Sequence, residues 1–278
     1  MENSKVLVIG GSRNIGYYSA VRLLALGATV TFLLRSPRVF DQDDTIQNYI
    51  KEGKARLIQG DALVKSDVRR AWSEAQHQQG DDSDARPVDF LIFTVGGIPQ
   101  FSLRKGFTVT PPNLVTQSLL NVLETLPSPH PKIITISSIG LTHASHQILP
   151  LPLKPVYSYL LSEPHKDKCG AEEAIAHSAG WTWDARDSPG NEISGVDWTN
   201  RIPNPGELKS IVVVRPALFT DGECRADVKG KGSEAYRVKE GDLESSWTIS
   251  RMDVAHFLVE GVVRHWQKWE GKCVSVAY

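Results

Sequence analysis

Short apolar runs alternate with amphipathic segments through the first half of the chain. Five apolar runs are short enough for buried strands, and they lie at residues 6–9, 29–34, 55–59, 88–93 and 132–136. Helical spacing of apolar positions predicts helices at residues 17–26, 45–52, 66–76 and 113–126. Continuous apolar strands alternating with helices are typical of a parallel sheet covered on both faces. We therefore predict an α/β fold with a doubly wound, Rossmann-type sheet.

The pattern becomes looser in the second half. It predicts helices at 167–178 and 252–265 and strands at 210–214, 248–249 and 273–277. Residues 77–87 are polar and predict a surface loop, and residues 181–209 predict a surface insertion or a lid. Without an internal repeat or an independent linker, one domain spanning 1–278 is expected. Its cofactor part would cover about 1–140, and its substrate-binding elements mainly 141–166 and 217–250.

Composition narrows the choice of partner. A net charge of −1 and a pI near 6.7 give no basic surface for nucleic acid or for an anionic membrane. The three cysteines are widely spaced, so neither a disulfide framework nor a metal cluster is expected. No apolar run approaches membrane-spanning length, and no secretory signal pattern precedes the first strand. We expect a cytoplasmic protein whose partner is a small molecule.

The first apolar run breaks directly into a glycine turn. The sequence Val6-Leu-Val-Ile is followed by Gly10-Gly11-Ser-Arg-Asn-Ile-Gly16 and then by an amphipathic segment. Such a strand, turn and helix lets backbone amides approach a dinucleotide pyrophosphate at the helix N-terminus. The glycines lack strict Gly-x-Gly-x-x-Gly spacing, so the motif depends on the rest of the chain for support.

Taken in order, these motifs resemble the short-chain dehydrogenase/reductase superfamily, specifically its atypical, NmrA-like branch. The further matches are Gly60-Asp61, Gly96-Gly97, Ser137-Ser138, Lys168-x-x-x-Glu172, Arg215-Pro216 and Arg251-x-Asp253-Val254-Ala255. Two departures lie in the turn, where Ile9 replaces a threonine and Asn14 replaces the middle glycine. Asparagine tolerates left-handed backbone angles, so the turn is expected to keep its conformation.

The resemblance implies a set of cofactor contacts. They are Gly10, Ser12, Arg13, Asn14, Ile15, Gly16, Arg35, Asp61, Ala62, Val95, Gly96, Lys168 and Pro216. NAD-selective sites usually place an acid after the second strand, whereas Arg35, with Arg38 beside it, suits a 2′-phosphate. Arg13 would converge on the same phosphate, so NADP(H) is preferred over NAD(H). The alternatives are a solvated strand-end charge for Arg35 and a turn or cap role for Asp61.

The catalytic motif of the family is incomplete. Familiar members use Tyr-x-x-x-Lys with a serine, and Lys168 occupies the lysine position, placed there by Glu172. Pro164 stands where the tyrosine would be and cannot donate a proton. Tyr159 and His165 are the candidate substitutes, and Ser138 would donate a hydrogen bond to the substrate. The alternative for Lys168 is an exposed helical lysine.

The expected function is an NADPH-dependent oxidoreductase. Its substrate would be a small or medium organic carbonyl or enone, of the kind met in secondary metabolism, with the C-terminal third lining the pocket. A different class is a non-catalytic dinucleotide-binding sensor that docks on a protein partner through residues 181–209. A non-redox isomerase or cyclase on the same fold is the third reading.

Overall fold

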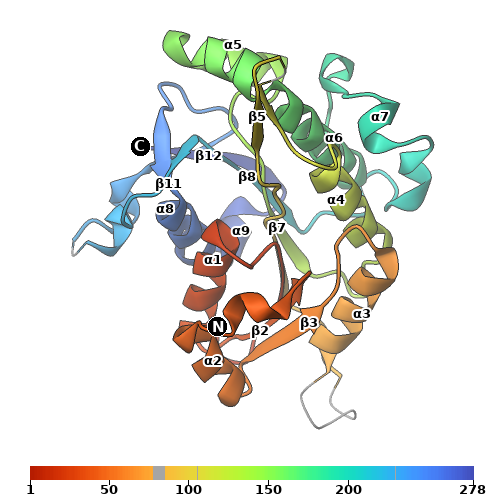
Figure 1. Ribbon diagram of the computed structural model, residues 1–278, viewed down its shortest axis with the longest axis vertical. Coiled ribbons are helices and arrows are strands. Elements are labelled where there is room, and N and C mark those ends of the chain that lie inside the picture. The colour runs from red at the N-terminus through yellow and green to blue at the C-terminus, as the bar shows by residue number, and fades with distance from the viewer. Residues whose placement is uncertain (78–84, 105, 229) are drawn as a thin grey trace.

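An eight-stranded sheet forms the centre of the computed structural model, which describes residues 1–77, 85–104, 106–228 and 230–278 (Figure 1). In spatial order its strands are β10 (Arg237–Glu240), β12 (Lys272–Ala277), β8 (Ile211–Pro216), β7 (Lys132–Ile136), β4 (Phe90–Phe93), β1 (Lys5–Ile9), β2 (Thr29–Leu34) and β3 (Ala55–Gln59). All neighbours are parallel except the pair β10 and β12. The strand order reverses between β1 and β4, which is where doubly wound sheets bind ligands.

Helices cover both faces of the sheet. One face carries α1 (Asn14–Ala25), α2 (Asp44–Lys51), α8 (Arg251–His256), a π-helical stretch at Phe257–Val263, and α9 (Trp266–Trp269). The other face carries α3 (Lys65–Gln76), α4 (Leu114–Glu124) and α6 (Ser162–Ala179). Side chains of a strand alternate between the faces, so Val8 packs in the first layer and Leu7 in the second. The predicted fold class is confirmed.

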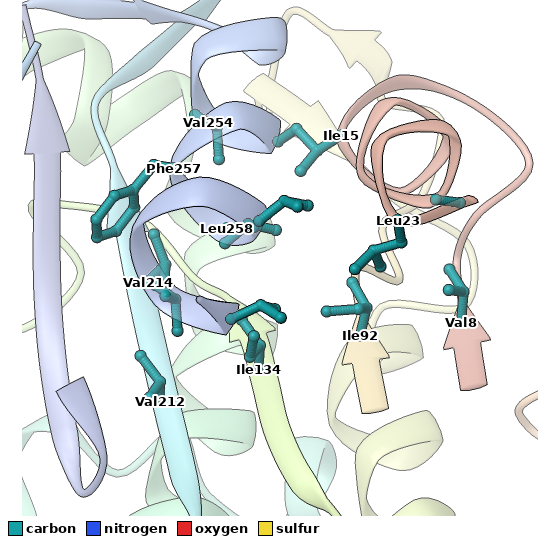
Figure 2. Packing of buried hydrophobic residues seen from close by; sticks show 14 of the residues in the cluster. Val8, Ile15, Leu23, Ile92, Ile134, Val212, Val214, Val254, Phe257 and Leu258 are labelled. Carbon is teal, nitrogen blue, oxygen red and sulfur yellow. The ribbon is translucent and has the colours of Figure 1, made fainter. Parts of the chain in front are cut away.

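The first core layer joins the two ends of the chain. Figure 2 shows Ile15 of α1 and Val254 of α8 facing each other above the sheet, with Ile92 and Ile134 below them. All four side chains are at most 6% exposed. Helix α8 therefore holds the start of α1, and with it the glycine turn, against the sheet.

Several small elements were not predicted. They are the hairpin β5 (Gln100–Ser102) and β6 (Gly106–Thr108), the strands β9 (Leu218–Thr220) and β10, and the short helices α5 (His143–Ile148) and α7 (Asn191–Ser194). The predicted short strand at 248–249 is β11 (Thr248–Ser250), and it pairs with β9. Of the loop predicted at 77–87, residues 78–84 lie outside the described part of the chain.

Residues 181–209 cover the outside of α4 and α6. Arg201 donates to Asn121 Oδ1 at 2.8 Å and to Glu124 Oε2 at 3.1 Å, both on α4. The ring of Trp198 packs edge to face on His177 of α6, with 5.5 Å between centroids. The segment is thus tied to two helices by polar and aromatic contacts, as a surface insertion would be. Within the described residues, no helix is both long and apolar enough to cross a membrane.

Candidate cofactor and catalytic site

The glycine turn lies where β1 meets α1, against the end of β4. Gly10 has a φ of +92°, and Asn14 takes the left-handed φ of 54°. A Cβ on Gly10 would lie 2.5 Å from the carbonyl carbon of Thr94, and one on Gly16 would lie 2.3 Å from Thr94 Oγ1. Asn14 therefore adopts the left-handed conformation expected where the family has glycine, and the cradle leaves no space for side chains at Gly10 and Gly16.

Replacing Gly10 by alanine should damage this cradle. The added Cβ forces both a strained φ and a shift of the Thr94 backbone, so we expect a stability loss of about 1–3 kcal/mol and weaker dinucleotide binding. Denaturant unfolding and NADPH titration measure the two effects. Gly222→Ala is the matched control, because Gly222 has no positive φ, a Cβ there would meet nothing within 4 Å, and it is not one of the predicted cofactor contacts. Equal behaviour of the two variants would contradict the cradle.

The N-terminus of α1 is open to an anion. Arg13 occupies the N-cap position with extended backbone and makes no side-chain cap, so the first amides of the helix are available. Arg13 and Arg35 are exposed, and within the described residues neither guanidinium has an ion pair or a side-chain hydrogen bond. Cationic side chains that lack a protein partner suit a phosphate of a ligand.

The other predicted cofactor residues lie on the same edge of the sheet. Asp61 follows β3, and its Oδ1 accepts a hydrogen bond from the amide of Leu63 at 2.9 Å, which is the turn role foreseen as the alternative. Ala62 accepts a bond from Asn121 Nδ2 at 3.0 Å, and Val95 is half-buried after β4. Pro216 is the last residue of β8 and accepts a bond from the Ile139 amide at 3.1 Å. Because parallel strands end on one edge, the structure brings these positions together with the turn.

Lys168 reaches from α6 to the end of β7. Its Nζ donates to the carbonyl oxygen of Ser137 at 2.9 Å, so it is not the exposed helical lysine of the alternative reading. Ser138 is the next residue and is partly exposed, as its predicted role requires. Within the described part of the chain, Ser137 Oγ is one of the buried side-chain atoms without a hydrogen-bond partner. The carbonyl of Ser137, which sequence patterns do not reveal, orients the ammonium.

Burial changes the acid–base properties of the groups around Lys168. It lowers the pKa of the Lys168 ammonium to about 8, against the opposing attraction of Glu172 and Asp167. It also lowers the pKa of His165 to about 3, with a smaller effect of the Lys168 charge, and raises the pKa of Tyr157 to about 12. At neutral pH His165 and Tyr157 are therefore uncharged. Lys168 is protonated, and it releases its proton more readily than an ordinary lysine does.

The two predicted substitutes for the missing tyrosine are placed differently. His165 is half-buried and packs edge to face on Tyr157, with 5.3 Å between ring centroids. Tyr159 is 48% exposed, and its hydroxyl donates to the carbonyl of Leu103 on the β5–β6 hairpin. The Tyr159 hydroxyl is thus engaged by the hairpin, and His165 carries no extra proton at neutral pH. The role of either residue as the acid stays a prediction.

Glu172, whose spacing locates Lys168 in the motif, does not pair with it. The Glu172 carboxylate binds the guanidinium of Arg215 on β8, with Nε and Oε1 3.0 Å apart. A four-residue spacing on a helix allows a lysine–glutamate pair, but a bidentate arginine is the stronger partner for a buried carboxylate. Lys168 is instead held by a backbone carbonyl.

A hollow of about 270 Å³ lies one helical turn before Lys168. Its lining residues come from the hairpin, the following loop and the start of α6, and they are Ser102, Thr108, Val109, Pro112, Glu163 and Pro164. A Cβ on Gly97 would lie 1.9 Å from Val109, which places the loop directly over the end of β4. A second hollow of about 300 Å³ involves residues 128–130 and 207–210, before β7 and β8 begin, so it opens at the opposite edge of the sheet.

The residues present fit a nicotinamide dinucleotide. The turn has no room for a side chain at Gly10 or Gly16, and the α1 amides are uncapped. Two exposed arginines lack partners among the described residues, and the buried Ser137 hydroxyl is unpaired. Within the same described ranges, no cluster of three His, Cys, Asp or Glu side chains could hold a metal ion.

The sheet order defines a Rossmann-type fold of the kind found in NAD(P)-binding dehydrogenases, reductases and epimerases. The anaerobilin reductase ChuY from Escherichia coli superposes with a TM-score of 0.57 at 16% identity, covering 98% of this chain and 96% of that chain. A short-chain dehydrogenase from Burkholderia cenocepacia, solved with NADP, gives a TM-score of 0.55 at 20% identity, covering 94% and 91%. These likenesses show the fold.

Two fungal enzymes are similar in sequence. The reductase pytE of Aspergillus terreus is 27% identical over 203 residues, which are 69% of this chain and 67% of that protein. The oxidase pynE of Aspergillus niger is 25% identical over 272 residues, covering 88% and 84%. No family model matches the chain. The resemblance to oxidoreductases is thus supported, and membership of the NmrA-like branch stays a prediction.

Proposed function

We propose that this chain is an NADPH-dependent oxidoreductase acting on a small or medium organic carbonyl or enone. The observation that carries the proposal is the Lys168 ammonium, fixed on the Ser137 carbonyl at the edge that bears the glycine turn. The similarity to a reductase and an oxidase supports the same class. A member of that class needs a dinucleotide site and a proton source at one place, and the glycine turn and Lys168 at this edge would serve as the two.

The binding residues would divide the dinucleotide between them. The amides of the glycine turn and the α1 N-terminus would bind the pyrophosphate, and Arg13 and Arg35 would bind the 2′-phosphate. When bound, the dinucleotide supplies or accepts a hydride. The Lys168 ammonium can donate three hydrogen bonds. One goes to the Ser137 carbonyl, which leaves two for a ribose hydroxyl and the substrate oxygen. Ser138 would add a second donor to that oxygen.

Arg35→Ala should reduce the preference for NADPH. Losing one charge-assisted bond to phosphate costs about 1.5–3 kcal/mol, so the ratio of NADH to NADPH dissociation constants should fall by roughly 10–100-fold. Fluorescence titration with both dinucleotides measures the ratio. Arg69→Ala, an exposed arginine on α3, is the control and should leave it unchanged. An unaltered ratio in Arg35→Ala would remove Arg35 from the site.

The substrate end of the site is apolar at its rim. Exposed apolar side chains gather before and on the β5–β6 hairpin, with Ile98 63%, Phe101 58% and Leu103 86% exposed. Tyr159 ties this hairpin to the stretch before α6, and the hollow beside Pro164 opens below it. A substrate with apolar bulk around its carbonyl would cover these side chains, because removing apolar surface from water is favourable.

Turnover is the direct test of the proposal. The pure protein is first titrated with NADPH and NADH, and NADPH oxidation is then followed against a panel of ketones, quinones and enones. We expect tighter binding of NADPH and turnover of at least one apolar enone or quinone. Tight binding without turnover on the whole panel would contradict an oxidoreductase.

A dinucleotide-binding sensor is the second candidate. The observation in its favour is Pro164, which takes the position of the family's proton donor in the first turn of α6. A sensor would bind NADPH as tightly as an enzyme would, but it would oxidise no NADPH with any compound of the panel. Lys168→Met would leave its binding to a protein partner unchanged. The panel therefore separates the two functions.

A further inference from the structure

A buried ion pair lies one turn of α6 beyond Lys168. Arg215 at the end of β8 donates through Nε to Glu172 Oε1 at 3.0 Å and through Nη2 to Glu172 Oε2. Glu172 is 3% exposed and Arg215 9% exposed. A bidentate pair of this kind fixes the direction of the carboxylate as well as its charge.

The direction of the Glu172 carboxylate matters because Lys168, four residues earlier on the same helix, is another candidate partner for it. A lysine four residues before a glutamate lies on the same helix face, and the two side chains commonly pair. Within the described residues, however, none of the ion pairs includes Lys168. Its ammonium binds the neutral carbonyl of Ser137, while the carboxylate that could neutralise it is turned to the sheet.

Within the described residues, the other charged and titratable groups near Lys168 do not bond to it either. Both oxygens of Asp167, on the same helix, accept bonds from the α4 amides of Val115 and Thr116 at 2.8 Å. On the opposite side of Arg215, Asp242 Oδ1 lies 3.7 Å from Nη1 and accepts no hydrogen bond within the described chain. The groups from α5, from the stretch before α6 and from the start of α6 are His146, Tyr157 and His165, and Tyr157 and His165 are uncharged at neutral pH.

We infer that Arg215 is a positioning residue which withholds Glu172 from Lys168, so that the lysine keeps a transferable proton. An opposite charge bonded to the ammonium would strengthen its hold on that proton and reduce its use as an acid. The inference rests on the proposed function, in which Lys168 serves the substrate oxygen. Arg215 on β8 would thus influence the proton supply, although it belongs to no catalytic motif.

The test measures how Lys168 titrates in the protein without cofactor. Reductive methylation is followed as a function of pH by peptide mass spectrometry, with the exposed Lys166 of the same helix as internal reference. In Arg215→Met the freed Glu172 should turn to Lys168 and raise its apparent pKa by at least one unit, a tenfold gain in proton affinity. The double variant Glu172→Gln with Arg215→Met has no carboxylate to release, so Lys168 should titrate as in the wild type.

Arg215→Lys serves if Arg215→Met does not fold. A lysine keeps the charge but cannot make the bidentate contact, so one carboxylate oxygen is released and a smaller rise of about threefold in proton affinity is expected. A folded Arg215→Met or Arg215→Lys protein in which Lys168 titrates as in the wild type would overturn the inference. So would an equal rise in the double variant, which would trace the shift to lost packing.

This readout needs no turnover, so the two proposals fail in different ways. A wild-type protein that oxidises no NADPH contradicts the proposed function, whatever Lys168 does. If turnover is found, the inference adds that the alkaline limb of the kcat profile moves to higher pH in Arg215→Lys, in step with the methylation curve.

Discussion

Lys168→Met should abolish most of the NADPH-dependent turnover, lowering kcat by roughly 10²–10⁴-fold, the range in which a positioned proton donor contributes. The reason is that methionine keeps the length and apolar stem of the side chain but has no proton for the substrate oxygen. The Ser137 carbonyl loses its donor at the same time. Steady-state kinetics on a substrate found in the panel measures the effect.

The matched control is Lys166→Met, on the same helix but with a half-exposed side chain that pairs with Glu163 at 3.3 Å. It should leave kcat within a factor of two or so. In the wild type, kcat should fall as pH rises through the Lys168 pKa of about 8, because the acid form is lost. If Lys168→Met turned over at the wild-type rate, the assignment of the proton to Lys168 would be wrong.

Asp253→Ala should be among the most destabilising single substitutions in the chain. The carboxylate is fully buried and accepts bonds from the Ala226 amide at 2.9 Å, the Arg225 amide at 3.1 Å and the Ser250 hydroxyl at 2.9 Å. Each buried donor left without a partner costs about 1–3 kcal/mol, so a loss of roughly 4 kcal/mol or more is expected in denaturant unfolding.

Asp221→Ala is the control for this prediction, since that carboxylate is 84% exposed and pairs with Arg251 at the surface. Its free energy of unfolding should change by less than about 0.5 kcal/mol. If Asp253→Ala lowered the free energy of unfolding by a similarly small amount, the segment at Arg225 and Ala226 would not depend on this carboxylate.

The pH dependence of the Asp253 contribution has a defined sign. Although burial disfavours the charge, bonds from Tyr278 and from the amides of Ala226 and Arg225 hold its pKa below the ordinary value. A carboxyl whose pKa is lower in the folded state stabilises above its unfolded pKa of about 3.9 and loses that contribution as the pH falls through the folded pKa. The stability difference between wild type and Asp253→Asn should therefore shrink below about pH 4.

Local patterns were sufficient for the parallel sheet and its helices. The run at Val6–Ile9 and the turn after it could be interpreted from sequence because strand, turn and helix are contiguous, and the left-handed Asn14 is a local property of the backbone. The hairpin β5–β6 was missed because its strands are three residues long and partly exposed, so they carry no apolar run.

The candidate site could be predicted only in part for a related reason. The position of Lys168 came from a motif, but its partner is the backbone carbonyl of Ser137, 31 residues away, which has no sequence signature. The pairing of Glu172 with Arg215 spans 43 residues and competes with a local pair that the sequence suggests more strongly. Contacts between distant segments are decided by packing of the whole domain, which one chain's pattern does not encode residue by residue.

Three charged residues of helix α6 bind three different elements. Asp167 binds the amides of α4, Lys168 binds the end of β7, and Glu172 binds β8. A rotation of the helix by one residue would bury each charge against the wrong partner, so its register is locked without any contribution from residue 164. None of these three contacts involves Pro164, so a substitution at this position is expected to leave Lys168 in place.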